Sequence, residues 1–187
     1  MQLVFDTETS GFKTNHIIQL AYALIDDLGN VLNKVNTSFK LPEGVKIEEG
    51  AFKCHGIKDE DLKDCEPIEK SGLALFIKNC NDAKRVIGHN VSFDIRMIKN
   101  EYNRHKSKMP YLDLVKLEKK SFCTMKSTTQ YCRISKATQA GYKWPKLQEL
   151  HKKLFGNNFE DAHDALADVM ATHRCFVELL DRKVIKI

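Results

Sequence analysis

Apolar residues in the first forty positions are arranged as in β-strands. Residues 3–5, 17–25 and 31–39 are rich in Ile, Leu, Val, Tyr and Phe, and residues 26–30 (DDLGN) are typical of a hairpin turn. This pattern predicts three antiparallel strands in succession. The short apolar run at 85–88 predicts a fourth strand, and because a helical stretch precedes it, we expect that strand to run parallel to the first.

Helical periodicity dominates the rest of the chain. In several segments the apolar residues recur at spacings of three and four. Residues 112–117 fit either a fifth strand or a helix. The predicted helices cover residues 48–54, 59–63, 67–79, 91–104, 124–131, 146–155 and 164–181.

The composition is that of an ordinary globular protein. The chain has 187 residues, of which 42% are hydrophobic and 29% charged, so we expect a single domain spanning residues 1–187. No apolar run is long enough to cross a membrane and no signal segment begins the chain, which predicts an intracellular, cytoplasmic protein that does not act at a membrane. The six cysteines form no Cys-x-x-Cys pair, which argues against a zinc site and against a disulfide framework.

The net charge of +5 conceals an uneven distribution of charge. Residues 99–153 contain 14 Lys or Arg against 4 Asp or Glu, which leaves 16 basic and 21 acidic residues elsewhere. A basic middle segment beside acidic clusters favours a polyanionic substrate such as a nucleic acid. Solvated helix faces would explain the same lysines. If the segment grips a nucleic-acid backbone, we expect Lys143 and Lys146 to contribute.

Four carboxylates occupy places where charge is costly. Asp6 and Glu8 follow a buried run two residues apart, so an extended backbone points both side chains the same way. Asp94 lies on the apolar edge of its predicted helix, and Asp168 flanks the apolar stripe of the last helix. A charged strand end would explain Asp6 and Glu8 alone. The four together are the oxygen donors that Mg²⁺ prefers.

This donor set suits the hydrolysis of a phosphodiester. Two cations about 3.5–4 Å apart need several shared carboxylate oxygens; one activates the attacking water and the other stabilises the leaving oxygen. His163, five residues before Asp168, is placed to accept the proton of that water. Four other histidines have no carboxylate partner at ligand spacing along the sequence: His16, His105, His151 and His173.

Three ordered motifs resemble those of the DnaQ-like, or DEDDh, family of 3′→5′ exonucleases. They are residues 5–11 (FDTETSG), 89–94 (HNVSFD) and 163–168 (HDALAD). Residues 51–57 (AFKCHGI) resemble a segment of members close to the bacterial DNA polymerase III epsilon subunit. The resemblance implies a ribonuclease H-like α/β fold, with a mixed five-stranded sheet flanked by helices.

The resemblance also implies a role for each site residue. The four carboxylates would bind two Mg²⁺ or Mn²⁺ ions, and His163 would be the general base. The implied metal ligands are Asp6, Glu8, Asp94 and Asp168. A pocket for the 3′-terminal nucleotide would be formed by Thr7, Thr9, Gly11, Phe12, Phe52 and His55, with Phe12 as a stacking or wedging residue.

The implied activity is metal-dependent release of nucleoside 5′-monophosphates from the 3′ end of single-stranded DNA or of a frayed duplex. It would serve proofreading beside a DNA polymerase, or DNA-end processing. Two alternatives stay open. One is a 3′→5′ exoribonuclease of the same superfamily, and the other is a nuclease-derived module that binds nucleic acid without cleaving it.

Overall fold

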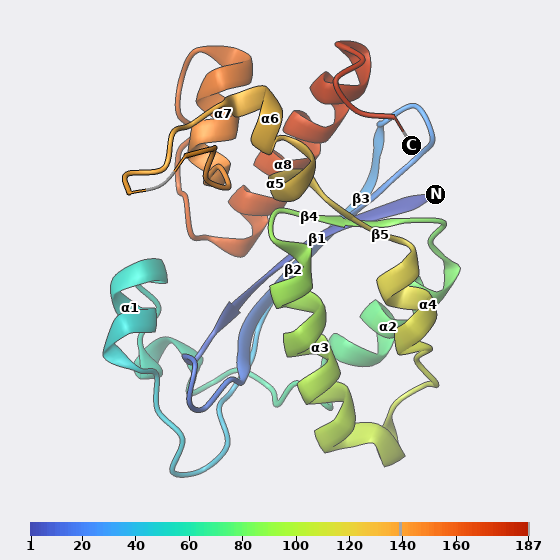
Figure 1. Ribbon diagram of the computed structural model, residues 1–187. Helices are drawn as coiled ribbons and strands as arrows, with labels where there is room; N and C mark the ends of the chain where they lie inside the picture. Colours follow the sequence, from blue (N-terminus) through green and yellow to red (C-terminus); the bar gives the residue numbers. More distant parts are fainter. Residues whose placement is uncertain (139, 187) are drawn as a thin grey trace.

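A mixed sheet of five strands forms the centre of the molecule, in the order β3-β2-β1-β4-β5 (Figure 1). The structure, a computed structural model, describes residues 1–138 and 140–186. The first three strands pair antiparallel, and the fourth pairs parallel to the first, as predicted. The strands are β1 Gln2–Thr9, β2 Ile17–Ile25, β3 Val31–Ser38, β4 Val86–Gly88 and β5 Ser121–Cys123. The predicted α/β class with a mixed five-stranded sheet is confirmed.

The fifth strand lies later in the chain than the segment that was ambiguous in the sequence. Leu114–Lys119 forms helix α4, which Asp113 caps by accepting a hydrogen bond from the Lys116 N–H at 2.9 Å. β5 follows after one residue and pairs parallel to β4. A strand of three residues is too short to display an alternating pattern, so periodicity did not locate it.

Helices cover both faces of the sheet and create two cores. The remaining helices are α1 Glu49–His55, α2 Leu73–Asp82, α3 Val91–His105, α5 Thr124–Ser127, α6 Thr129–Cys132, α7 Leu147–Phe155 and α8 Ala165–Asp181, with 3₁₀ turns at Asp59–Leu62 and Lys106–Lys108. Leu3 and Phe5 of β1 enter the core that contains α2 and α3, whereas Val4 enters the core that contains α7 and α8. Successive strand residues face opposite sides, so β1 serves both cores. In Figure 1, α1 stands apart from these layers.

Two predicted helices have different bounds in the structure. The helix expected at 67–79 begins only at Leu73, because Gly72 adopts a left-handed φ of +84° and lies against the ring of Phe39. The helix expected at 124–131 is divided at Thr128 into α5 and α6. No helix in the described residues is long and apolar enough to span a membrane.

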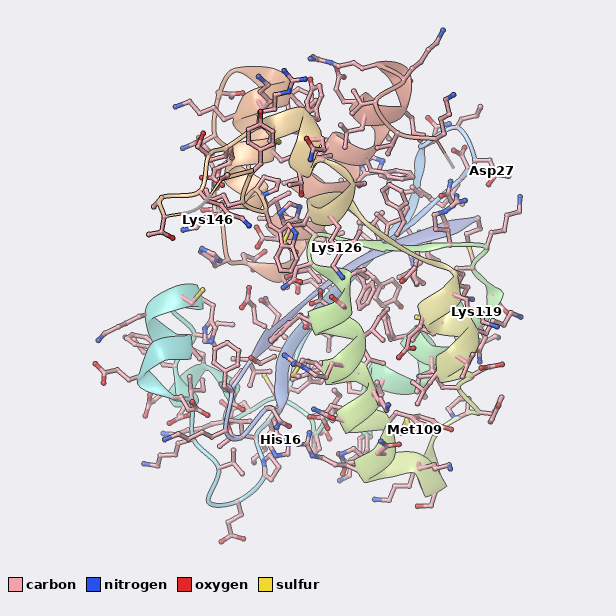
Figure 2. The ribbon with its side chains drawn as sticks, viewed as in Figure 1. His16, Asp27, Met109, Lys119, Lys126 and Lys146 are labelled. Atoms are coloured by element: carbon pink, nitrogen blue, oxygen red, sulfur yellow. The ribbon has the colours of Figure 1, made fainter. Side chains whose placement is uncertain are left out.

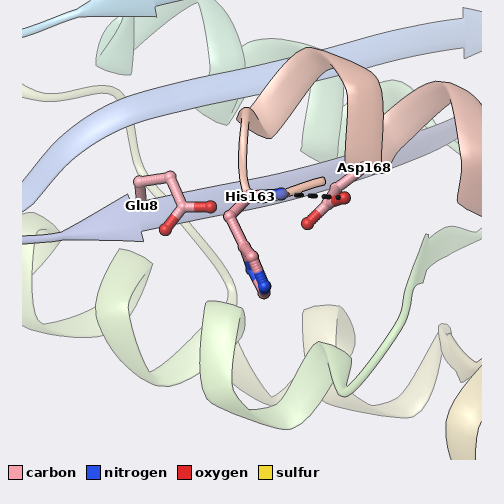
Figure 3. A group of neighbouring side chains, drawn as sticks. All are labelled: Glu8, His163 and Asp168. Carbon is pink, nitrogen blue, oxygen red and sulfur yellow. Dashed lines mark hydrogen bonds between the residues drawn. The ribbon is translucent and has the colours of Figure 1, made fainter. Parts of the chain in front are cut away.

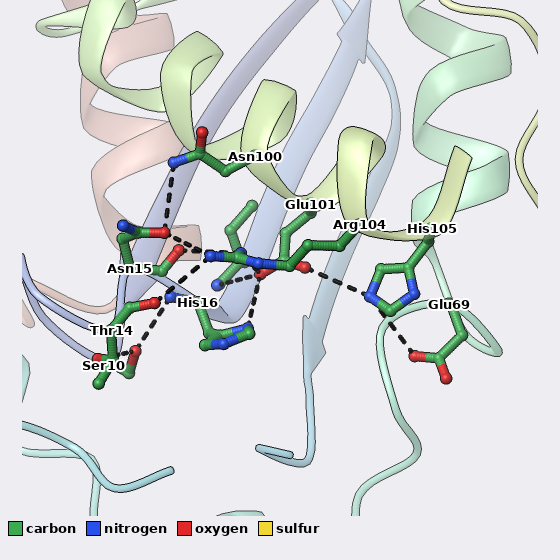
Figure 4. Close-up of polar contacts among 10 residues, drawn as sticks. Ser10, Thr14, Asn15, His16, Glu69, Asn100, Glu101, Arg104 and His105 are labelled. Carbon is green, nitrogen blue, oxygen red and sulfur yellow. Dashed lines mark hydrogen bonds and ion pairs between the residues drawn. The ribbon is translucent and has the colours of Figure 1, made fainter. Parts of the chain in front are cut away.

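A buried carboxylate ties the start of β2 to α3 (Figure 4). Glu101 is fully buried, and its Oε1 accepts hydrogen bonds from the Ile17 N–H at 3.1 Å and from the Arg104 guanidinium at 2.9 Å. His16 Nδ1 lies 3.2 Å from the same oxygen, and His105 Nε2 lies 3.5 Å from the other. The expectation that His105 has no carboxylate partner at ligand spacing is therefore wrong, whereas His16 finds its partner far away along the chain. Glu101 reaches His105 across one helical turn and reaches His16 through the packing of β2 on α3.

Candidate active site

The second half of β1 extends beyond its parallel neighbour. β4 pairs only with Leu3 and Val4 of β1, which continues to Thr9. Asp6 and Glu8 therefore lie within the last four residues of the strand, which extends beyond the apolar run at 3–5. This stretch of β1 pairs with β2 on one side and has passed the end of β4 on the other. In α/β sheets, ligands bind at such a place, where the direction of the strand order changes.

Helix α3 begins close behind β4 and brings Asp94 to this place. Gly88 permits the tight junction, since an added Cβ would lie 3.3 Å from the carbonyl oxygen of Phe5. Asp94 is 3% exposed, and its Oδ1 accepts hydrogen bonds from Thr7: from the backbone N–H at 3.2 Å and from the hydroxyl at 2.8 Å. Asn90 occupies the N-cap position of α3, but it has a φ of +72° and makes no capping hydrogen bond through its side chain.

Helix α8 brings Asp168 to the site from the other face of the sheet, with His163 just before the helix (Figure 3). Asp164 caps α8 by accepting hydrogen bonds from two N–H groups of its first turn, each at 3.0 Å, and from the Gln19 amide at 3.1 Å. His163 has a left-handed φ of +72°, and its N–H donates to Asp168 Oδ1 at 3.4 Å. Such a conformation is uncommon outside glycine and is concentrated at functional sites.

Three of these residues form a cluster of metal-binding type. Glu8, His163 and Asp168 each offer one donor atom that lies within 4.8 Å of the donors of the other two (Figure 3). Asp6 and Asp94 are not members of this group, although the charge of Asp94 acts on Glu8 and the charges of Glu8 and Asp168 act on Asp6. Carboxylate oxygens are the preferred ligands of hard divalent cations. The residues present therefore fit a divalent cation at the end of β1.

The carboxyl groups of the site are held in an environment that opposes ionisation. Burial raises the pKa of Glu8 to about 8, and the charges of Asp168 and Asp94 add to the effect. Burial also raises the pKa of Asp94 to about 7, against the hydrogen bonds from Thr7, and that of Asp168 to about 6. Burial, and after it the charges of Asp94, Asp168, Glu8 and Asp164, raise the pKa of Asp6 well above its ordinary value.

No Lys or Arg of the described residues forms an ion pair with these four carboxylates. Like charges that share a buried site raise one another's pKa, and a nearby positive charge reverses the effect. A bound divalent cation would supply the positive charge that the protein does not provide here.

A pocket of about 320 Å³ adjoins the acidic cluster, between the end of β1 and α1. One wall is formed by Glu48, whose Oε1 accepts hydrogen bonds from the Lys13 N–H at 2.7 Å and the Thr14 N–H at 3.0 Å. The Glu48 carboxylate fills the space beside Gly11, where an added Cβ would lie 2.3 Å from it. With a φ of +133° as well, position 11 accepts only glycine without rearrangement.

Five of the six predicted pocket residues line this pocket: Thr7, Thr9, Gly11, Phe12 and His55. The Phe12 side chain is 82% exposed and packs edge-on against Phe93, with the ring centroids 6.3 Å apart. His55 Nε2 donates to the Thr9 carbonyl at 3.2 Å, which fixes the ring. Phe52 is not a lining residue. Helix α1 turns Ala51, Cys54 and His55 toward the pocket, and at helical spacing this directs Phe52 elsewhere.

Three residues at the site were not singled out from the sequence. Cys54 lines the pocket, and its Sγ lies 3.6 Å from His163 Nδ1. Its place beside His55 in the segment 51–57 was a usable signal in the sequence. Asp164 precedes an alanine-rich helix, which is an N-cap pattern. Glu48 gave no local signal, because its partners lie 34 and 35 residues away in the chain.

Comparison with known sequences identifies one family. The family model described as "Exonuclease" (RNase_T) matches residues 3–176. The chain is 29% identical over 185 residues to the "DNA polymerase III PolC-type" of Pediococcus pentosaceus, a match that covers 96% of this chain and 11% of that protein. It is 31% identical over 105 residues to the "DNA polymerase III subunit epsilon" of Buchnera aphidicola, covering 53% of this chain and 43% of that protein. The chain thus spans less than half the length of these curated relatives.

Solved structures of low sequence identity share the fold. Exonuclease I matches with a TM-score of 0.77 and 20% identity, over 97% of this chain and 41% of that chain. Exonuclease X in complex with 5′ overhanging duplex DNA matches with a TM-score of 0.66 and 21% identity, over 100% of this chain and 95% of that chain. These likenesses confirm the ribonuclease H-like fold.

Proposed function

The chain belongs to the RNase_T exonuclease family, and from this membership we propose that it is a metal-dependent 3′→5′ exonuclease acting on single-stranded DNA. The products would be nucleoside 5′-monophosphates. We assign the activity to a single exonuclease domain, residues 1–187, because the two cores share one sheet.

One observation carries the proposal: four carboxylates meet at the end of β1 with raised pKa values and no Lys or Arg partner among the described residues. A protein that used these groups only for folding would neutralise them, because an uncompensated buried charge is strongly destabilising. The intact donor set disfavours a module that binds nucleic acid without cleaving it. Asp6, Glu8, Asp94 and Asp168 are therefore proposed as the ligands of two Mg²⁺ or Mn²⁺ ions.

The chain's own residues divide the work of hydrolysis. Bound divalent cations would activate the attacking water and stabilise the leaving oxygen. Thr7 holds Asp94 in place through two hydrogen bonds. His163 is proposed to accept the proton of the water, since its ring lies close to the carboxylates of Glu8 and Asp168 and its backbone is fixed by Asp168.

The pocket beside the cluster is proposed to hold the 3′-terminal nucleotide. Its position next to Glu8 would place the last phosphodiester at the carboxylates. Thr7, Thr9 and Gly11 form the wall provided by β1 and the turn after it. Phe12 offers an exposed ring for stacking on a base or for wedging between two bases, and His55 closes the wall formed by α1.

The names of the relatives favour DNA as the substrate. Two curated relatives are named as forms or subunits of DNA polymerase III, and exonuclease structures of the same fold contain DNA. Association with a DNA polymerase, and with it proofreading, is proposed on the same basis. An exoribonuclease of the same superfamily is the alternative, because the discrimination depends on contacts to the 2′-OH.

The test is a degradation assay on DNA and RNA single strands of one sequence, labelled at the 5′ or the 3′ end. With Mg²⁺, 5′-labelled DNA should shorten stepwise while 3′-labelled DNA releases its label at once as a mononucleotide. RNA should be degraded more slowly. Full activity in excess EDTA would contradict the metal requirement, and a ladder from the opposite end would contradict the polarity. Faster degradation of RNA would favour the alternative.

A further inference from the structure

The single tryptophan of the chain lies on the surface. Trp144 is 61% exposed in the segment that joins α6 to α7. Isolated exposed apolar residues are common and need no explanation. Trp144 differs because the backbone that carries it is fixed on both sides. That backbone is also hydrogen-bonded to His89, just before helix α3, which carries Asp94.

Three contacts fix this segment. The Lys143 N–H donates to the Ile134 carbonyl at 2.8 Å, and its ammonium group binds both oxygens of Glu149 at 2.6 and 2.7 Å. The N–H of Lys146 donates to the same carboxylate at 2.7 Å. An aromatic ring on a backbone that is already ordered loses little conformational entropy when it binds a ligand.

His89 connects the segment to the active site. It follows β4 and precedes α3, the helix that carries Asp94. Its Nε2 lies 2.9 Å from the Pro145 carbonyl oxygen, and its Nδ1 lies 3.0 Å from the Thr124 hydroxyl. The hydrogen bond that the His89 ring donates to the Pro145 carbonyl therefore joins the residue after Trp144 to the junction that positions Asp94.

The two lysines that flank Trp144 differ in their surroundings. Lys143 forms an ion pair with Glu149, and we assign it to holding the segment; its contribution to gripping nucleic acid stays a prediction. Lys146 makes no ion pair with any described residue, and its charge acts on the thiol of Cys54 in the pocket. Figure 2 shows Lys146 on the side of the molecule where α1 stands, whereas Lys119 lies on the opposite side, on α4.

We propose that Trp144 and Lys146 form a second binding subsite, which holds the single strand on the 5′ side of the terminal nucleotides. Trp144 stacks on a base, and Lys146 contacts a backbone phosphate. The occupant is single-stranded nucleic acid, because only an unpaired base exposes a face for stacking. The subsite rests on the proposed function, and it assigns to this exonuclease a preference for strands longer than a dinucleotide.

Trp144 is also its own reporter, since it is the only source of tryptophan fluorescence in the chain. Wild-type protein in EDTA, which prevents hydrolysis, is titrated with thymidine oligonucleotides of two and of ten nucleotides. The ten-nucleotide strand should quench the fluorescence, and the dinucleotide should not. A parallel titration with a ten-nucleotide uridine strand shows whether DNA and RNA share the subsite. No quenching by either long strand would overturn the proposal.

Variants separate stacking from charge. Trp144→Leu should bind a labelled ten-nucleotide strand on the order of 10- to 100-fold more weakly, the range expected for the loss of one stacked base. Lys146→Ala should reduce the slope of log affinity against log salt by about 0.7, the value for one phosphate contact to a single strand. Lys119→Ala, which removes the same charge on the opposite side, should leave the slope unchanged.

An assay of dinucleotide hydrolysis separates a failure of the proposed subsite from a failure of the proposed exonuclease activity. Trp144→Leu and Lys146→Ala should both hydrolyse the dinucleotide as fast as wild type, because neither residue is assigned to the reaction. Wild-type binding of the long strand by Trp144→Leu, or equal salt slopes for Lys146→Ala and Lys119→Ala, would refute the subsite while leaving the exonuclease intact. A wild-type protein that binds strands but never cleaves them would refute the proposed function instead.

Discussion

Helix α3 buries two carboxylates on one side, and their surroundings are opposite. Asp94 and Glu101 are seven residues apart, 3% and 0% exposed respectively. Burial opposes the ionisation of both. Around Glu101 the hydrogen bond from His16 and the charge of Arg104 outweigh burial and lower its pKa (Figure 4). Around Asp94 the donors come from Thr7 and are neutral, and burial raises its pKa to about 7.

The difference lies in where the positive charge comes from. The Glu101 cluster contains its own cation, Arg104, and serves to join β2 to α3. The cluster of Asp94 contains three more carboxylates and no Lys or Arg partner among the described residues. Burial alone therefore does not distinguish a functional carboxylate from a structural one. The two kinds of carboxylate are distinguished by the direction of the pKa shift and by the cause of that shift.

Activity should show the largest difference between the two carboxylates. Asp94→Asn keeps an oxygen to accept the hydrogen bonds of Thr7 but removes the charge, so the rate on a 5′-labelled strand should fall at least about 10³-fold, the upper end for the loss of one charge-stabilising group. Glu101→Gln on the same helix is the matched control and should keep most of the activity. Equal losses in the two variants would contradict the division of roles.

A second comparison is between two histidines: His163, which precedes α8, and His173, which lies in α8. His163→Ala should lose about 10²–10⁴ in rate, the range for general acid–base catalysis, while it still binds metal and substrate. His173→Gln changes a histidine of the same helix whose Nε2 contacts the Gly29 carbonyl at 2.7 Å, far from the reaction. It should hydrolyse DNA like wild type. A His163→Ala enzyme with the wild-type rate would mean that the base lies elsewhere.

For stability we expect the reverse: the Glu101 variant should lose more than the Asp94 variant. Glu101→Ala removes the carboxylate that His16 and Arg104 share, and the loss of one partner from a buried ion pair costs roughly 3–5 kcal/mol. Asp94→Asn relieves repulsion among the acidic residues, so the metal-free variant should be as stable as wild type or more stable. Urea unfolding in EDTA measures both values. A larger loss of stability in Asp94→Asn than in Glu101→Ala would show that the two roles have been exchanged.

The pH dependence of stability has a definite sign. Glu8, Asp94 and Asp168 have pKa values of about 8, 7 and 6, above their ordinary values near 4 in an unfolded chain. The folded state therefore binds more protons than the unfolded state over this interval, and the contribution of these groups is lost as pH rises from about 4 to about 8. Glu101 contributes in the opposite direction, because its lowered pKa adds stability that is lost as the pH falls.

Unfolding in EDTA at several pH values compares wild type with Glu8→Gln. The variant should lose less stability between about pH 5 and pH 8, since it cannot release that proton. If the stability of metal-free wild type rose steadily over this interval, the acidic cluster would not be held in its protonated form.

The local parts of this account were accessible from the sequence. Strand-like runs predicted β2 and β3, and helical spacing predicted α3 and α8 within a residue or two. The buried edge position of Asp94 followed from its place between Val91 and Ile98. These features depend on neighbours within one or two turns, which the sequence displays directly.

Features that depend on distant partners were not predictable in the same way. Glu101 did not stand out, because the start of β2 reaches it only after folding, 84 residues away along the chain. Phe52 was assigned to the pocket although helix α1 directs it elsewhere, since the rotation of a short helix depends on what it packs against.

The most direct test of the central claim is a calorimetric titration of Mn²⁺ into metal-free protein near pH 7, with a saturating nucleoside 5′-monophosphate present. Carboxyl groups with raised pKa values must release protons when they bind a cation, so the measured heat should depend on the ionisation enthalpy of the buffer. The account predicts two Mn²⁺ per chain with proton release, and loss of this binding in Asp6→Asn but not in Glu101→Gln. Absence of Mn²⁺ binding to wild type, or equal binding to Asp6→Asn without proton release, would contradict it.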